Sequence, residues 1–395
     1  MNLRRALILT ALLMATLGAW GQHVRLCGEA QRGALYVDLD ELWRYNLYEH
    51  SRWGLGLKYI RQPDASRNTT LSAYVGYGVE DRQWKGGLNF SLRRGASTVH
   101  LTAAREYAAA GSRRSVAAHL SDFDDLSAFM TRRMSDYAVF VGGYRHQYGA
   151  ATYAAEAHLF LGGRLFDGNG LLYRCLGDRI VRENVGEMQL QAQLQNGITT
   201  TLLAGHTWPD GKPVAQALVQ YDKELQLPVL TFNFFAQGGA TPKGVPYIRM
   251  FDLGGTYHAP LYFRNTLLTA APNEFTANMF TLASLRVVAS RPLWKLWSRL
   301  LQVGSYPRPF VGVSGAWGML WGQEADGSLT YEGLSLQAPV KGIVEPVAGI
   351  EGLVRWGVVD WGVATAWRMV PAGANYRHSD WHDNLTLMLC ARLAW

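Results

Sequence analysis

Six consecutive residues near the carboxyl end, His378-Ser379-Asp380-Trp381-His382-Asp383, hold the densest group of side chains able to carry chemistry. Histidine and aspartate together bind metals or exchange protons in catalysis. A solvated loop before the last strand explains the same residues more simply. The sequence has no HExxH zinc motif, no GxSxG nucleophile elbow and no phosphate-binding loop. We therefore expect no enzyme, no catalytic residue, no metal and no cofactor, with a loop-borne hydrolase as the minor alternative.

A second set of charged residues lies inside segments in which every other side chain is apolar. Its members are Arg286, Arg368 and Arg392 with Glu187, Glu351 and Asp360. Inside a pore, such a set could form a charged constriction that selects solutes. The interpretation that we favour is that the charges pair with one another and hold a loop to the wall.

The last eleven residues indicate the element that carries these charges. One face takes Leu385, Leu387, Leu389, Ala391, Leu393 and Trp395, and the other takes Thr386, Met388, Cys390, Arg392 and Ala394. Successive side chains of a strand point to opposite faces, so the segment is a strand with one apolar side. A sandwich strand has the same pattern. A last strand that ends on an aromatic residue is, however, typical of outer-membrane β-barrels, and we predict that this apolar face is their assembly signal.

The amino-terminal residues favour the barrel over the sandwich. Arg4 and Arg5 precede an apolar stretch, Ala6 to Leu17, which is too short to span a bilayer. Ala19-Trp20-Gly21 then supplies a small-x-small cleavage pattern. Residues 1–21 are predicted to be a cleaved signal peptide, and the mature protein is expected in the outer membrane.

The same alternation recurs along the chain. It predicts an all-β fold, a transmembrane antiparallel β-barrel of about sixteen strands. Residues 22–51 are interpreted as a short periplasmic leader and 52–395 as the barrel, with short helical turns at 122–133 and 293–301 on the periplasmic side. The strands are expected at 52–61, 69–80, 82–92, 97–106, 136–147, 150–162, 180–194, 197–208, 213–221, 228–237, 245–253, 274–289, 308–321, 343–356, 358–370 and 383–395.

Composition agrees with a barrel and excludes several other classes. After residue 21, no run approaches the roughly 20 apolar residues of a membrane-spanning helix. Loss of Arg4 and Arg5 with the signal reduces the net charge from +7 to +5, and the basic residues are scattered, so nucleic acid is not an expected partner. The cysteines, Cys27, Cys175 and Cys390, are too few and too widely spaced for a disulfide framework.

The connection at 254–273 is long and carries aromatic and basic residues, such as Tyr262 and Arg264, in place of a flexible polar mixture. A barrel of about sixteen strands leaves a wide lumen. We expect this connection to fold into the lumen as a plug, with Arg264 paired to Glu351 or Asp360. The alternative is an exposed loop that binds an external ligand.

Four short motifs in order resemble a known family, the Bacteroidota outer-membrane barrel called domain of unknown function 5686. They are Tyr45 to Gly56, Gly76 to Asp81 with Lys85 to Leu88, Leu253-Gly254-Gly255 with Pro272 to Phe275, and Val344 to Ile350 with Asp383-Asn384. The resemblance covers most of residues 40–395. The chain departs from the family in lacking an amino-terminal carboxypeptidase-regulatory-like domain and in having Tyr48-Glu49-His50 where an acid-glycine pair is usual.

A more distant similarity is to the sixteen-stranded barrels of the BamA/TamA insertase and two-partner secretion group. Tyr262-Phe263-Arg264-Asn265 replaces the Arg-Gly-aromatic core of that group's luminal loop. The function that we expect is transport or assembly of a solute or client across or into the outer membrane. Outer-membrane lipid and the barrel-assembly machinery are the expected partners. The alternative is a structural or surface-binding barrel that transports nothing.

Overall fold

In the computed structural model, 23–46, 49–109, 133–167, 179–253, 255, 262, 265–271, 273–289, 307–356, 359–371, 374 and 384–393 are the residues that the structure describes. The chain divides into two compact units. The fold is nearly all-β, and eighteen strands belong to a large antiparallel sheet, which confirms the predicted class. Among the described residues, no helix is long and apolar enough to cross a membrane.

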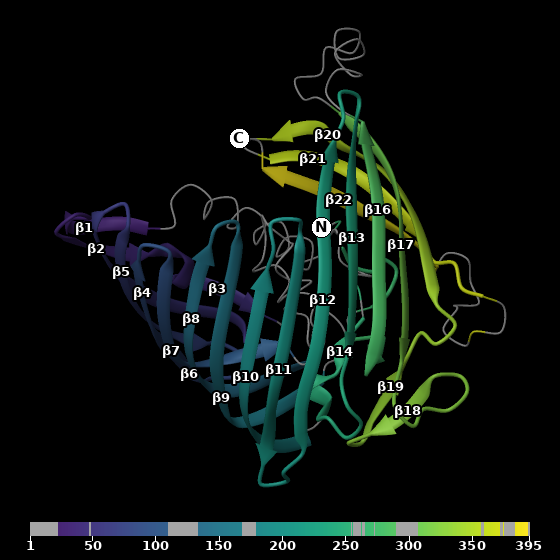
Figure 1. The fold of residues 1–395 in the computed structure, drawn as a ribbon, viewed down its shortest axis with the longest axis horizontal. Coiled ribbons are helices and arrows are strands. Elements are labelled where there is room, and N and C mark those ends of the chain that lie inside the picture. Colours follow the sequence, from purple (N-terminus) through teal and green to yellow (C-terminus); the bar gives the residue numbers. More distant parts are fainter. Residues whose placement is uncertain are drawn as a thin grey trace. The chain divides into compact units, whose positions relative to one another are not determined.

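The first unit consists of antiparallel strands that follow one another along the chain (Figure 1). Consecutive strands from β4 to β9 are paired, and β2 and β3 both pair with β4, at residues 56–60 and 50–53. The elements are β1 (His23–Glu29), β2 (Gly33–Asp38), η1 (Leu39–Glu41), β3 (Trp43–Asn46), β4 (His50–Asp64), β5 (Arg67–Gly78), β6 (Trp84–Arg94), β7 (Ser97–Ala109), β8 (Arg133–Tyr148), β9 (Ala151–Asp167) and β10 (Arg179–Gln193). The two units share β11 (Ile198–Trp208).

The second unit holds the remaining strands, and its main strands pair in the order β12, β13, β16, β17, β20, β21, β22. Its elements are β12 (Pro213–Gln226), β13 (Leu230–Ala240), η3 (Tyr247–Arg249), β14 (Phe251–Asp252), β15 (Thr276–Ala277), β16 (Met279–Ala289), β17 (Arg308–Met319), β18 (Ser328–Tyr331), β19 (Leu334–Gln337), β20 (Ile343–Trp356), β21 (Val359–Trp367) and β22 (Leu385–Leu393). The pairs β14–β15 and β18–β19 stand apart from the large sheet.

Fifteen of the sixteen expected strands correspond to strands of the large sheet. The exception is 245–253, which forms η3 and the two-residue strand β14. Its side chains at 245–247 and 250–253 are buried without alternation, so the apolar spacing reflects packing of a connection and not a strand with two faces. The other three strands, β1 to β3, lie in 22–51, the expected leader. The signal peptide and the helical turn expected at 293–301 lie outside the described residues, as does the turn expected at 122–133 except for Arg133, the first residue of β8.

In both units, strands of the large sheet have one exposed apolar face and one buried or polar face. In β22, Leu385, Leu387 and Leu389 are exposed while Met388 and Cys390 are buried, as the sequence predicts. Val311 and Val313 of β17 are likewise exposed, while the intervening side chains of that strand face the second unit's core. A side chain that reaches one face therefore alternates with one that reaches the other.

In the first unit, the exposed face carries an apolar band with distinct edges. Trp53, Tyr77 and Trp84 are cross-strand neighbours and form one exposed aromatic row. Along β4 and β5, leucine, valine and aromatic side chains continue this exposed face. The apolar band ends at Arg61, which is exposed and lies opposite Thr69. The eight residue-to-residue steps from Trp53 to Arg61 span about 27 Å of strand, which is comparable with the apolar band, about 25 Å tall, of an outer-membrane barrel.

Candidate functional site

The connection between β13 and β16 covers the buried face of the second unit's sheet, opposite its exposed apolar face. Leu267, Leu268, Thr269 and Ala270 of this connection are all buried. Leu267 and Ala270 pack in one apolar cluster with β13, β16 and β17 side chains, and Leu268 packs in another with residues of β20, β21 and β22. The described part of the connection is therefore packed on the sheet and is not a projecting loop.

A fully buried carboxylate on β20 holds the connection at one point. Glu345 accepts hydrogen bonds from the backbone N–H groups of Leu268, at 2.7 Å, and Thr269, at 3.0 Å. The Thr269 hydroxyl donates a further bond to the same carboxylate. Several bonds to one carboxylate compensate for its removal from water. Glu345 thus fixes the backbone of the connection without depending on most of its side chains.

A buried arginine holds the connection at a second point. Arg368, which follows β21, is 1% exposed, and its guanidinium binds both carboxylate oxygens of Glu274, at 2.7 and 3.0 Å. Its Nε atom donates to the Thr269 hydroxyl at 3.2 Å, and its NH2 group donates to the Thr269 carbonyl. Glu274 also accepts the Ala271 N–H at 2.6 Å. The two-bond arginine–carboxylate geometry makes this contact directional as well as strong.

A third contact joins the connection to the predicted charged residues. Arg286 of β16 lies with its guanidinium carbon 3.9 Å from the Phe310 ring centre and 5.3 Å from that of Tyr262. Its NH2 group binds Glu351, whose other oxygen binds Arg308 at 2.8 Å. The Tyr262 N–H donates to the Leu389 carbonyl of β22 at 2.8 Å. The last strand is thereby tied to the connection.

These contacts locate the predicted site residues. Glu351 pairs with Arg286 and Arg308, and Arg368 pairs with Glu274. Asp360 lies opposite Arg392 in the β21–β22 register. Arg264 lies outside the described residues, so its pairing stays a prediction, as do the roles of Trp395 and of 378–383. The sequence did not single out Glu274 or Glu345 as site residues. Both occur there only within the family motifs at 272–275 and 344–350.

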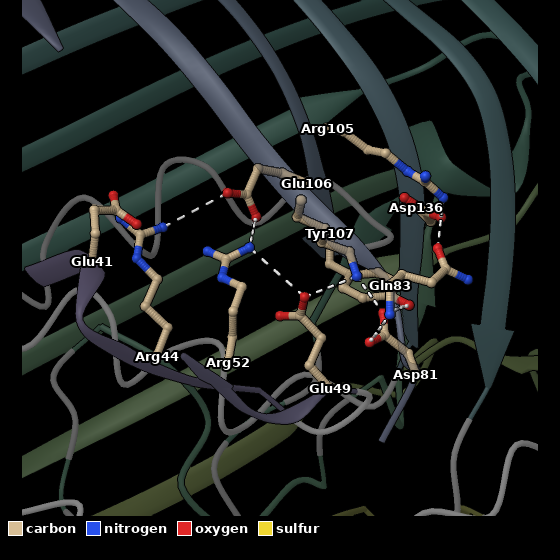
Figure 2. A network of polar contacts seen from close by, with 11 residues as sticks. Glu41, Arg44, Glu49, Arg52, Asp81, Gln83, Arg105, Glu106, Tyr107 and Asp136 are labelled. Carbon is tan, nitrogen blue, oxygen red and sulfur yellow. Dashed lines mark hydrogen bonds and ion pairs between the residues drawn. The ribbon is translucent and has the colours of Figure 1, made fainter. Parts of the chain in front are cut away.

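The first unit contains a larger ionic network, which the sequence analysis did not predict (Figure 2). Lys85 is almost completely buried, and its Nζ atom lies 2.8 Å from Glu49 Oε1, in contact with Asp81 and 4.1 Å from the Tyr107 ring centre. Arg52 binds Glu106 at 2.7 Å and lies 3.7 Å from Glu49. The carboxylates thus neutralise two buried cations.

The network extends to both sides of Lys85. Arg44 binds Glu41 at 2.5 Å and lies 4.0 Å from Glu106, and the second contact links the segment between β2 and β4 to the group (Figure 2). Arg105 binds Asp136 at 3.1 Å. Room for these groups comes from glycine. A Cβ atom at Gly78 would collide with the Asp81 carboxylate, and one at Gly76 would lie 2.9 Å from Arg52 Cγ. The Gly76-Tyr77-Gly78 motif therefore serves the network.

A smaller cluster lies on the same face of the first unit. His158 is buried between two carboxylates, with Nδ1 3.0 Å from Glu187 and Nε2 3.0 Å from Glu156. His100 lies 3.5 Å from the other oxygen of Glu156. Gly143 lies between His100 and Glu156 in the register, and a Cβ atom there would collide with both. Among the described residues, no histidine, cysteine or acid cluster has the arrangement of a metal site.

Comparison with known proteins gives similarities among solved structures alone. No family model and no curated protein matches the chain. CdiB from Escherichia coli is 12% identical, with 94% of this chain and 64% of that chain covered and a TM-score of 0.49. BamA from Haemophilus ducreyi lacking POTRA domains 1–3 is 11% identical, with coverages of 96% and 78% and a TM-score of 0.48. The siderophore receptor PirA from Pseudomonas aeruginosa is 10% identical, with coverages of 88% and 59% and a TM-score of 0.40. The chain thus spans under two thirds of CdiB, and none of these similarities bears on function.

Proposed function

We propose that the protein is an outer-membrane β-barrel that carries a solute or client across, or assembles it into, the outer membrane, with the connection between β13 and β16 as a plug. The observation that carries this proposal is the attachment of that connection to the buried face of its sheet. Glu345 and Arg368 hold it by backbone and side-chain bonds, and both side chains are buried.

The membrane part of the proposal rests on the exposed face. A soluble protein rarely exposes a continuous apolar surface of this extent. The aromatic row of Trp53, Tyr77 and Trp84 stands where ring systems suit a membrane interface, and the exposed Arg61 marks the opposite limit of the band. Lipid of the outer membrane is the partner that this surface fits. A barrel placed there also requires the barrel-assembly machinery and an export signal, for which residues 1–21 are the proposed segment.

The plug part of the proposal rests on the chemistry of the contacts. A loop that recognises an external ligand leaves its polar groups available, whereas Thr269 and Glu274 of the connection bind Glu345 and Arg368 of the sheet side. The connection is thus built to fill space and to be held. A pore whose plug is attached by a few ionic contacts can open without the strands separating. We propose no enzymatic activity.

Conductance in a planar bilayer tests the proposal. The mature protein should show little or no conductance, because the connection fills the lumen. Arg368→Met should raise it, and deletion of 256–273 should raise it further. Arg145→Gln, which removes an exposed arginine of the first unit, is the charge-matched control and should behave as the wild type.

The same recordings separate the alternatives. If neither the deletion nor Arg368→Met conducts although both insert into the bilayer, a structural or surface-binding barrel replaces the transport function.

The proposed membership of the Bacteroidota barrel family has a separate test. Genes for close relatives of this chain should encode the same four motifs in the same order.

A further inference from the structure

One edge of the apolar band in the first unit carries a concentrated positive charge. Arg67 of β5 and Arg94 of β6 are direct cross-strand neighbours, and both are exposed. Arg61 of β4 is exposed on the same face, opposite Thr69. Like charges directly opposite each other in a sheet are destabilising unless an anion lies between them. This pair therefore calls for an anionic partner.

Within the protein, the acidic side chain near these arginines is Asp64. Asp64 lies 3.6 Å from Arg67 Nε, and it also accepts bonds from Ser66. Among the described residues, Arg61 and Arg94 form no ion pair. Three arginines and one aspartate leave the cluster with a surplus of positive charge. Arg93, the neighbour of Arg94, points to the opposite face and does not add to it.

An apolar groove runs along the same face, further into the band. It has a volume of about 570 Å³ and is lined almost entirely by apolar atoms. Leu71, Phe90, Leu101 and Phe140 line it, and the small residues Gly142 and Ala157 lower its floor. Leu71 and Phe90 are cross-strand neighbours, four residues along β5 and β6 from Arg67 and Arg94. That separation is about 13 Å.

Groove and cluster together match one class of molecule. We propose that this face binds an anionic glycerophospholipid, with its phosphate on Arg67, Arg94 and Arg61 and an acyl chain in the groove. The row between them, Thr69 and Leu92, then faces the glycerol and ester region. Arginine suits phosphate because its planar guanidinium donates two parallel bonds. This inference rests on the proposed membrane location.

The turns indicate the leaflet. At the arginine end, β4–β5, β6–β7 and β8–β9 are joined by two-residue turns, at 65–66, 95–96 and 149–150. At the other end, the connections are 79–83, 110–132 and 168–178. Short turns mark the periplasmic end of outer-membrane barrels. The site therefore faces the periplasmic leaflet, where glycerophospholipid is the available anion. This assignment places the connection 110–132, which the sequence predicted on the periplasmic side, at the opposite end of the strands.

Native mass spectrometry of the full mature protein tests the site. The protein is equilibrated in detergent with equimolar dioleoylphosphatidylglycerol and dioleoylphosphatidylcholine, and the retained lipids are counted. The wild type should prefer phosphatidylglycerol. One arginine near an anionic surface contributes a factor of about five, so Arg67→Gln/Arg94→Gln should reduce the preference by about 25-fold. Arg93→Gln, on the same strand and the opposite face, should leave it unchanged.

A second variant addresses the groove. Gly142→Leu places a side chain on its floor, where a Cβ atom makes only an ordinary contact of 3.4 Å with Leu101. It should lower retention of both lipids and leave their ratio unchanged. Binding of soluble glycerol phosphate as tight as that of phosphatidylglycerol would refute the role of the groove. Preferential retention of lipid A would refute the assignment to the periplasmic leaflet.

An unchanged lipid ratio in Arg67→Gln/Arg94→Gln would overturn the inference as a whole. That result is distinguishable from failure of the proposed function. In the first case the protein inserts into bilayers and shows no headgroup preference at this site. In the second it does not insert at all.

Discussion

Lys85 Nζ lies 2.8 Å from Glu49 Oε1, and both side chains are almost completely closed to solvent. Their positions are set by different elements, because Lys85 is on β6 and Glu49 precedes β4. The ion pair therefore fastens the start of β4 to a strand that it does not touch in the sheet. A buried charge that loses its partner is costly, whereas loss of both partners costs far less.

Lys85→Met should accordingly lower the free energy of unfolding by about 3–5 kcal/mol, because Glu49 and Asp81 lose their shared cation. Lys85→Met/Glu49→Gln should recover part of the loss. Urea unfolding of the protein refolded in detergent measures both. Lys243→Met, an exposed lysine between β13 and β14, is the control and should unfold as the wild type does. Equal stabilities for Lys85→Met and the control would contradict the role given to the pair.

The Arg368–Glu274 contact should couple the connection to the sheet. Each of Arg368→Met and Glu274→Gln leaves one charged partner in a largely closed environment. A double-mutant cycle should give a coupling free energy of about 1–3 kcal/mol, as expected for side chains in one network. Proteolysis near Thr269 should be faster in either single variant. Additive effects in the cycle would show that the two side chains act independently.

Gly143 should resist substitution for a reason that lies on the neighbouring strands. Alanine at this position would collide with His100 and Glu156, which approach within 3.5 Å across β8. Gly143→Ala should therefore destabilise the first unit by about 1–3 kcal/mol, the usual cost of overpacking. Gly143→Ala/His100→Ala should relieve most of it. Gly142→Ala, on the same strand, is the control, because a Cβ atom there makes only an ordinary contact of 3.4 Å with Leu101.

The sequence predicts strands and faces well because alternation is a local property. The alternation of residue types in β22 was sufficient to predict that Leu385, Leu387 and Leu389 are exposed and Met388 is buried. The prediction of a strand at 245–253 is wrong because the apolar residues there are spaced for burial in a connection, and a local pattern does not distinguish that spacing from a strand. Polar contacts were less predictable still. Whether Arg368 contacts Glu274 depends on the backbone path of the whole connection. That path cannot be predicted from the pattern of residue types.

The face on which a residue lies should determine how much a charge at that position lowers stability. Leu389 is exposed on β22, whereas Gln191 lies half-buried on the polar face of β10. We expect Leu389→Arg to reduce stability by about 2–4 kcal/mol if the residue lies near the middle of the bilayer, because lipid cannot solvate the charge. Gln191→Arg should cost much less. Unfolding in phospholipid vesicles gives both values. A reversed order would mean that the register is shifted by one residue, since such a shift exchanges the two faces.

Trp395 should affect assembly of the protein into the outer membrane, at a stage before the barrel is folded. The apolar face of β22 ends toward Leu393 and Trp395, and we predict that this face with its terminal aromatic ring is read by the barrel-assembly machinery. Deletion of Trp395 should leave the protein in the periplasm, while Trp395→Phe, which keeps an aromatic ring, should restore assembly. Membrane fractionation with antibody detection measures the distribution. Thr386→Ser, a change on the buried face of the same strand, is the control. Normal outer-membrane levels after the deletion would show that assembly does not depend on the terminal ring.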